Sequence, residues 1–104
     1  MATVVSDDGR YEWDSDKDEA NFRKHGFHFV EILEVFDDPY FFEMYDALHS
    51  SDDEERMVGV GNIQGMLVVT TVFTERARTR IISSRRATAQ EEALYYERHN
   101  LDGR

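Results

Sequence analysis

The run Leu67-Val68-Val69-Thr70-Thr71-Val72-Phe73 constrains the fold more than any other stretch of this sequence. It is uncharged and rich in β-branched residues, so we predict a strand over 66–73. Apolar side chains would point to both of its faces, which indicates a place inside a sheet rather than at its edge. The preceding Asn-Ile-Gln-Gly at 62–65 predicts a hairpin turn that leads from another strand, over 56–61.

Signals on both sides of this hairpin predict the remaining elements. Further strands are expected at 10–13, 40–45 and 79–84. Helices are expected from the cap at 14–16 to Gly26, over 29–36, and from the capping box at 88–91 to about residue 99. The order β-α-α-β-β-β-β-α predicts an α+β fold: a mainly antiparallel sheet with two N-terminal helices and one C-terminal helix. We expect one domain over 1–104, with residues 1–9 as a loose end.

Several classes of protein are excluded or disfavoured by composition. The chain has no cysteine, so it has neither disulfides nor a thiolate zinc site. It has no apolar run near the length of about 18 residues that a membrane span needs, and its N-terminus does not resemble a signal peptide. We therefore expect a cytoplasmic protein with no membrane contact. The four histidines are scattered without metal-ligand spacing, and no nucleotide-binding motif is present, so we expect no metal and no cofactor.

Charge is distributed unevenly. The formal net charge is −10, which argues against a general nucleic-acid binder. Five of the twelve basic residues nevertheless lie between positions 76 and 86: Arg76, Arg78, Arg80, Arg85 and Arg86. Arginine offers a rigid fork of donors that suits phosphate, so this segment could contact RNA or DNA locally. The alternatives are a solvated strand edge that deters aggregation, and an acidic protein that meets a basic partner.

Several segments, in chain order, resemble the BrnT family of toxins from type II toxin–antitoxin systems. The matching pieces within residues 10–97 are Tyr11-Glu12-Trp13-Asp14 with Lys17, Asn21 with Lys24-His25-Gly26, Phe29, Val35-Phe36-Asp37-Asp38-Pro39, His49 with Glu54-Glu55-Arg56, Val72-Phe73-Thr74-Glu75-Arg76, and Arg80-Ile81-Ile82-Ser83-Ser84-Arg85-Arg86-Ala87-Thr88. The resemblance implies a RelE-like α+β fold and a metal-independent ribonuclease. It also implies a BrnA-type antitoxin with a ribbon-helix-helix DNA-binding domain, and repression of the operon by the toxin–antitoxin complex.

Cleavage of RNA without metal needs a base for the 2′-hydroxyl, cations for the phosphorane charge and an acid for the leaving oxygen. We predict catalytic roles for Arg56 and Arg80 as cations, and for Glu75 or His25 in proton transfer. On an alternating strand, Arg78, Arg80, Ile82 and Ser84 would share a face that Arg56 could join across the sheet. Ordinary ion pairs are the alternative for the arginines and for Glu75, and a helix cap is the alternative for His25.

Substrate binding is predicted for Lys24, Arg76, Ser84, Arg85 and Arg86. Lys17, Asn21 and Lys24 form a polar stripe on the first helix, which could border a phosphate groove or could be a solvated helix face. The function we favour is a ribonuclease held inactive by its antitoxin, with RNA as substrate and operator DNA bound only through the antitoxin. A second hypothesis is a catalytically weak binding module that acts only within that complex, and a third is a structural α+β domain.

Overall fold

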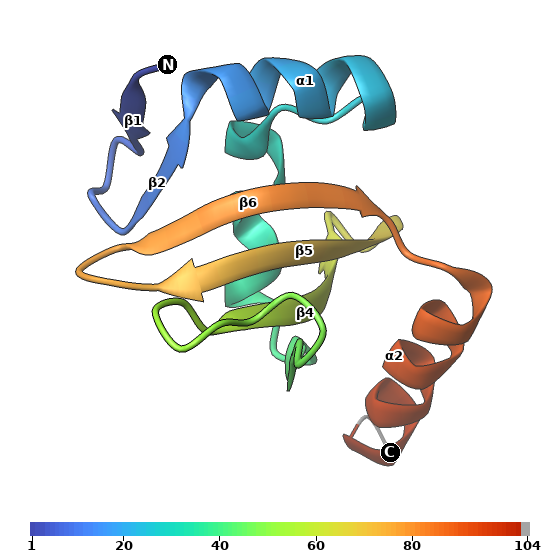
Figure 1. Ribbon diagram of the computed structural model, residues 1–104. Helices are drawn as coiled ribbons and strands as arrows, with labels where there is room; N and C mark the ends of the chain where they lie inside the picture. Colours follow the sequence, from blue (N-terminus) through green and yellow to red (C-terminus); the bar gives the residue numbers. More distant parts are fainter. Residues whose placement is uncertain (103–104) are drawn as a thin grey trace.

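The computed structural model describes residues 1–102 of the chain as an α+β fold with a six-stranded mixed sheet and three helices (Figure 1). The strands are β1 (Thr3–Val5), β2 (Tyr11–Asp14), β3 (Phe42–Tyr45), β4 (Arg56–Ile63), β5 (Leu67–Glu75) and β6 (Thr79–Arg86). The helices are α1 (Ser15–His25), the 3₁₀ helix η1 (Phe29–Asp37) and α2 (Ala89–Asp102).

The strand order is β1-β2-β6-β5-β4-β3, so β5 lies inside the sheet. The whole length of β4 pairs with it, from Arg56↔Thr74 to Ile63↔Leu67. The predicted central position of the apolar run is therefore confirmed. The turn is shorter than predicted, since β4 continues to Ile63 and only Gln64 and Gly65 take positive φ, of 53° and 71°.

Two features of the N-terminal part of the chain differ from what the sequence suggests. β2 pairs in parallel with β6 through Tyr11↔Thr79 and Glu12↔Arg80, so the sheet is mixed, with one parallel pairing beside four antiparallel ones. Residues 1–9 are not loose along their whole length, because β1 pairs with β2 and forms the sheet edge. The pairing of β2 with β6 joins residues far apart in sequence, and local sequence patterns carry no sign of such a partner.

η1 covers one face of the sheet and supplies much of the core. Phe29, Ile32 and Val35 are fully buried, together with Val69 and Phe73 of β5. We expected an α-helix here, but the buried residues recur every third position, which is the period of a 3₁₀ helix. η1 also lies close against β4, where an added Cβ at Gly61 would sit only 2.8 Å from the Val35 carbonyl oxygen.

α1 begins and ends where the sequence predicts. The Asp14 carboxylate accepts a hydrogen bond from the Lys17 N–H, and Gly26 closes the helix with a φ of 82°. Beyond Arg80, β6 has no strand partner on the β2 side, and α1 lies along that free edge (Figure 1). The buried Asn21 side chain accepts a hydrogen bond from the Ser84 N–H at 2.9 Å, which joins the helix to the strand.

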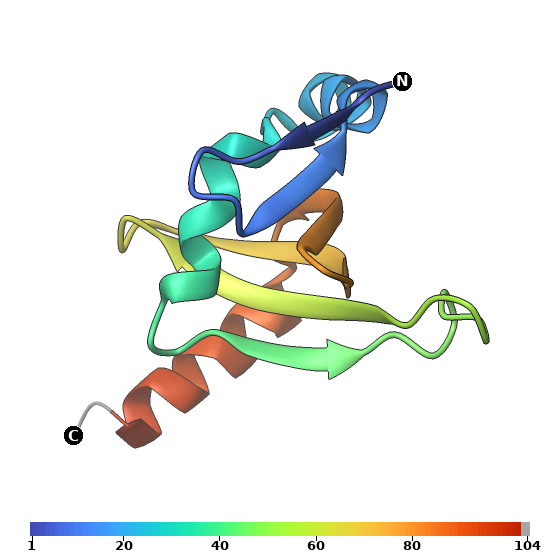
Figure 2. The same ribbon diagram turned by 90° about the vertical axis from the view of Figure 1, so that its left-hand side faces the viewer.

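α2 lies at one end of the sheet (Figures 1 and 2) and packs on the face opposite η1, because its contacts are with Val68 rather than with Val69 and Phe73. Its buried Tyr95 contacts Val60 and Val68. The predicted capping box is present, since Thr88 and Glu91 exchange hydrogen bonds. No helix within residues 1–102 covers the rest of this face, and we call it the open face. Within residues 1–102 no helix is both long and apolar enough to cross a membrane.

Candidate active site

The open face carries a row of side chains that crosses four strands. Arg56 of β4 is in register with Thr74 of β5, Thr74 with Arg80 of β6, and Arg80 with Glu12 of β2. Residues in register across a sheet point to the same side. The two arginines predicted to be catalytic therefore lie on one face, with the small, buried Thr74 between them.

A β-bulge in β6 decides which of its residues reach this face. Val72 pairs with Ser83 and Phe73 with Ile81, so Ile82 has no partner in β5. The extra residue reverses the alternation beyond it. Ser84 consequently points into the core, where it is fully buried and its hydroxyl lies 3.0 Å from that of Thr71. The prediction that Ser84 shares a face with Arg80 and contacts substrate does not agree with this placement.

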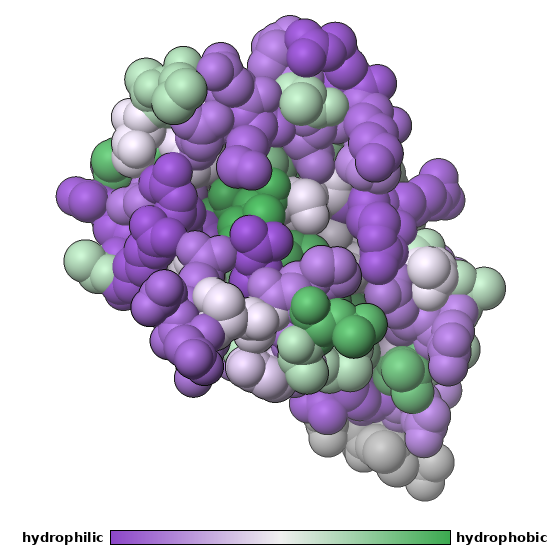
Figure 3. Space-filling model, in the orientation of Figure 1, coloured by the Kyte–Doolittle hydropathy of each residue, from purple (hydrophilic) through white to green (hydrophobic). Residues whose placement is uncertain are grey.

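A hollow of about 340 Å³ lies on the open face beside the arginine row. Arg56 and Arg85 line it together with His49 and Asp46 of the acidic loop between β3 and β4, and with Ser83 of the bulge. Apolar side chains, Val58, Val72 and Ile82, also line it. Figure 3 shows a hydrophobic depression surrounded by hydrophilic residues in the middle of this face.

A second, smaller hollow of about 210 Å³ lies between α1 and β6. Lys17, Lys24 and His25 of the helix line it, opposite Ile82 and Ser83. The same two bulge residues line the first hollow, so the two hollows adjoin. The structure thus brings the predicted Lys24 and His25 to the margin of the surface that contains Arg56 and Arg85.

Each arginine on the open face is held by a carboxylate of the same chain. The Arg80 guanidinium donates to Glu12, and Arg56 Nε donates to Glu54 at 2.9 Å. Arg85 donates two hydrogen bonds to the carboxylate of Glu91, at 2.7 and 3.0 Å.

These pairs shift pKa values. The Arg85 guanidinium lowers the pKa of Glu91 to about 2, and the hydrogen bond from Arg56 lowers the pKa of Glu54. A carboxylate partner fixes the direction of a guanidinium fork without using all five of its donors. Donors that face the hollow can therefore be held in place before substrate arrives.

His49 and Asp46 form a pair that sequence analysis did not single out. His49 Nδ1 lies 2.8 Å from Asp46 Oδ2, so the other ring nitrogen is free to face a substrate. The Ser50 hydroxyl fixes the loop, since it donates to the Asp46 carbonyl and accepts from the Arg56 N–H. Asp46 Oδ1 also accepts from the His49 N–H at 3.3 Å, and such local bonds from Asp side chains to the backbone are common in loops, so the three-residue spacing could have indicated the pair.

Three other predicted residues lie away from the open face. Glu75 has the same strand parity as the core residue Phe73, so it points to the η1 side, where its carboxylate accepts from the Thr79 hydroxyl at 3.1 Å. Arg86 pairs with Val69 and also points to the η1 side. Arg76 lies in the exposed β5–β6 hairpin and donates to Glu54 at 2.7 Å. Among residues 1–102, no group of three or more metal-ligating side chains gathers in one place.

Comparison with known families now gives the class of protein. The chain matches the family described as "Ribonuclease toxin, BrnT, of type II toxin-antitoxin system" over residues 13–91. It therefore belongs to the BrnT family of ribonuclease toxins. Its fold is similar to the crystal structure of the Brucella abortus ribonuclease toxin BrnT, with a TM-score of 0.56 and 24% identity over 73% of this chain and 92% of that one. No curated protein matches the sequence.

Proposed function

We propose that this chain is a cytoplasmic endoribonuclease that cleaves RNA on its open face without a metal ion. Family membership supplies the reaction class. The observation that carries the proposal is the alignment of Arg56 and Arg80 in one row across the sheet, beside a hollow that also contains Arg85 and His49. Cations fixed on rigid strands can stabilise a charge that develops only in the transition state.

The reaction would proceed by attack of a ribose 2′-oxygen on the adjacent phosphorus. A base takes the 2′-hydroxyl proton, the bond from phosphorus to the 5′-oxygen breaks, and an acid protonates that oxygen. The products are a 2′,3′-cyclic phosphate and a 5′-hydroxyl. Arg56, Arg80 and Arg85 stabilise the phosphorane charge. His49, oriented by Asp46, is the first candidate for proton transfer, and His25 on the adjoining hollow is the second.

Partner binding follows from the same family. The antitoxin would be of the BrnA type with a ribbon-helix-helix domain, and operator DNA would be bound only through it. In the hetero-oligomer the antitoxin would keep the toxin inactive. Lys24 and Arg76, which lie beside the open face rather than on it, would contact more distant phosphates of the RNA.

The test is cleavage of a defined RNA by purified toxin, free of antitoxin, in excess EDTA. Cleavage should persist, and the products should carry 2′,3′-cyclic phosphate and 5′-hydroxyl ends. Loss of cleavage in EDTA with recovery on adding Mg²⁺ would contradict the metal-free mechanism. A 5′-phosphate on the product would contradict attack by the 2′-oxygen.

A second candidate function is a binding module that acts only in a toxin–antitoxin complex on operator DNA. The net charge of −10 and the pairing of Arg80, Arg56 and Arg85 with carboxylates favour it. The two functions differ when the chain is expressed alone in a bacterium. The ribonuclease should arrest growth, whereas the binding module should allow normal growth while soluble, folded protein accumulates.

A further inference from the structure

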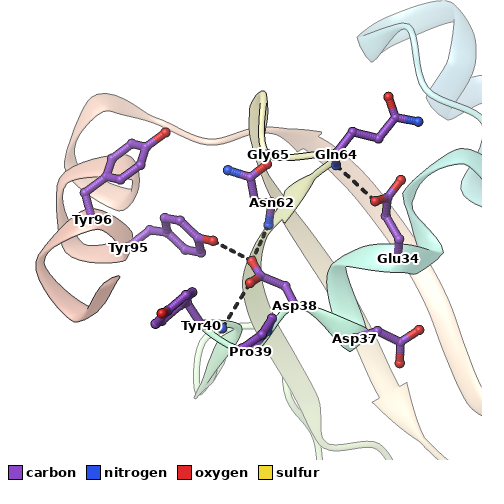
Figure 4. A pocket seen from close by; sticks show the side chains of 10 residues that line it. All are labelled: Glu34, Asp37, Asp38, Pro39, Tyr40, Asn62, Gln64, Gly65, Tyr95 and Tyr96. Carbon is purple, nitrogen blue, oxygen red and sulfur yellow. Dashed lines mark hydrogen bonds between the residues drawn. The ribbon is translucent and has the colours of Figure 1, made fainter. Parts of the chain in front are cut away.

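A hollow of about 440 Å³ lies between the C-terminal end of η1, the β4–β5 turn and α2 (Figure 4). Three carboxylates, Glu34, Asp37 and Asp38, and three tyrosines, Tyr40, Tyr95 and Tyr96, contribute to its lining. None of the lining residues is Lys, Arg or His. Unlike the open face, this hollow therefore offers no cation of its own, and an RNA phosphate would be repelled from its carboxylates.

Two of the three carboxylates have no cation beside them in the described part of the chain. Asp38 accepts three hydrogen bonds from neutral groups, the N–H of Tyr40, the N–H of Asn62 and the Tyr95 hydroxyl, at 3.0, 2.8 and 2.6 Å. Glu34 accepts from the Gln64 N–H at 3.0 Å. Within residues 1–102 neither forms an ion pair, whereas the exposed Asp37 pairs with Arg10.

The wall of the hollow contains further groups that suit a cationic donor. Burial and the neighbouring Asp38 raise the pKa of Tyr95, so its ring stays neutral. The Asn62 Oδ1 atom is buried and accepts no hydrogen bond from the part of the chain that is described. Tyr96, 44% exposed, and Tyr95 lie with their rings nearly perpendicular, 5.3 Å apart. Aromatic faces beside carboxylates are the surroundings in which proteins bind guanidinium and ammonium groups.

We propose that this hollow receives an arginine side chain of the antitoxin. A guanidinium offers five donors and a planar cation, which match the acceptors Glu34, Asp38 and Asn62 and the tyrosine rings. Arginine and tyrosine are also the residues that most often dominate the binding energy of protein interfaces. The inference uses the antitoxin that family membership implies, and it does not depend on whether the open face cleaves RNA.

The occupant is a protein rather than a nucleic acid because of charge. The acidic hollow and the net charge of −10 both favour a basic partner, and complementary charge speeds and orients protein association. The hollow also lies at the end of the sheet that α2 covers. An antitoxin anchored there could extend over the open face. It would not need to contact the arginines in the way that an RNA phosphate does.

The test compares affinity for the purified, co-encoded antitoxin, measured by titration calorimetry. Tyr96→Leu keeps apolar bulk but removes the aromatic face, and Glu34→Gln removes one negative charge. Glu43→Gln removes the same charge from the exposed surface of β3 and is the matched control. We expect each hollow variant to bind about tenfold more weakly, as for loss of one anchoring contact, with the control unchanged. Binding by both hollow variants as tight as wild type would overturn the proposal.

A second arm identifies the cation. Nα-acetyl-arginine amide, titrated into ¹⁵N-labelled wild-type toxin, should produce saturable shifts at the Asn62 side-chain amide and at Gly65, and the neutral citrulline analogue should not. Equal shifts with citrulline would contradict recognition of charge. All three variants should retain the RNA cleavage of free wild type. If wild type itself fails to cleave RNA, the proposed enzymatic function fails while the binding results still decide this inference.

Discussion

Three arginines of the open face are each paired with a carboxylate of the same chain: Arg80, Arg56 and Arg85. Glu12, Glu54 and Glu91 hold the three guanidinium groups in fixed directions. Such pairs contribute little stability where they are exposed to solvent, about 0–1 kcal/mol each. Their larger effect would be to orient donors toward the hollow before substrate binds, which lowers the reorganisation that catalysis requires.

The role of His49 in proton transfer can be tested by substitution. We expect His49→Gln to lower the cleavage rate about 10²–10⁴-fold, the usual contribution of a positioned proton-transfer group. Stability should hardly change, because the side chain is 65% exposed. Single-turnover cleavage and thermal melting are the measurements. His28→Gln is a control, since His28 lies against Asp18 and lines neither the hollow on the open face nor the one between α1 and β6. Equal rates for the two variants would transfer the proton-transfer role to His25.

The sequence indicated which residues could form the site better than it indicated the face of the sheet to which each side chain points. Arginine chemistry and the family resemblance pointed to Arg56, Arg80 and Arg85, and the structure gathers them on the open face. Glu75 and Ser84 failed to join them because strand alternation sends Glu75 to the other face and the bulge at Ile82 turns Ser84 inward. A single inserted residue reverses every later side chain, and the sequence carries no clear sign of it.

Among the elements, α2 depends on a small network around Glu91. Its carboxylate accepts from Arg85, from the Thr70 hydroxyl and from the Thr88 N–H. The hydrogen bond from Arg85 is the main reason that the pKa of Glu91 falls from 4.5 to about 2.

A lowered carboxylate pKa has a defined effect on stability. Between about pH 2 and pH 4.5, Glu91 binds a proton more readily in the unfolded chain than in the folded one. The stability that this difference supplies is therefore fully present above pH 4.5 and is lost as the pH falls toward 2. We expect this contribution to be about 1–2 kcal/mol, after allowing for the solvent that reaches Arg85. Urea unfolding at pH 7 and pH 3 should show a smaller acid-induced loss for Glu91→Gln than for wild type. An identical acid-induced loss of stability in the two proteins would show that Glu91 does not contribute to it.

The contact of η1 with β4 gives a prediction about packing. An alanine Cβ at position 61 would lie 2.8 Å from the Val35 carbonyl oxygen and 2.9 Å from the Val35 Cβ, closer than neighbouring atoms tolerate. Gly61→Ala should therefore lower the free energy of unfolding by about 1–3 kcal/mol. Met66→Ala, at an exposed turn residue, should leave it unchanged. Equal stability of Gly61→Ala and wild type, by urea denaturation, would mean that η1 moves away without cost.

Elements with strong local signals were predicted well. The apolar run of β5, the cap at Asp14 and Gly26, and the capping box of α2 each lie where sequence patterns indicate. The parallel pairing of β2 with β6 and the short edge strand β1 were missed, since both depend on partners that only the folded chain provides. The type of η1 was missed for a related reason, because apolar spacings of three and four coexist in that segment and packing selects the spacing of three.

Across the whole molecule, the arginine row and the hollow lined by Glu34 and Asp38 occupy different surfaces. The arginines are gathered on the open face. The acidic hollow lies at the C-terminal end of η1 (Figure 4). If three arginines replace counterions on single-stranded RNA, a plot of log affinity against log salt should have a slope of roughly −2. Fluorescence anisotropy with a catalytically impaired variant would measure it. A slope near zero would indicate that phosphates do not bind at the arginines.

Substitution of Arg80 tests whether RNA is cleaved at the arginine row on the open face. The most direct measurement is the single-turnover rate of cleavage of one defined RNA by wild type, Arg80→Ala and Arg23→Ala, all free of antitoxin, with melting temperatures recorded alongside. Arg23 is the matched control, because it is an exposed arginine of α1 in an ordinary ion pair with Glu19. The double variant Arg80→Ala/Glu12→Gln removes the carboxylate that the single change leaves unpaired.

We expect Arg80→Ala and the double variant to cleave about 10²–10³-fold more slowly, as for loss of one preorganised charged donor. Arg23→Ala should cleave at the wild-type rate, and the double variant should melt close to wild type. Cleavage by the folded double variant at the rate of Arg23→Ala would contradict a catalytic role for Arg80, because it would show that the row across β4, β5 and β6 is not where the reaction occurs.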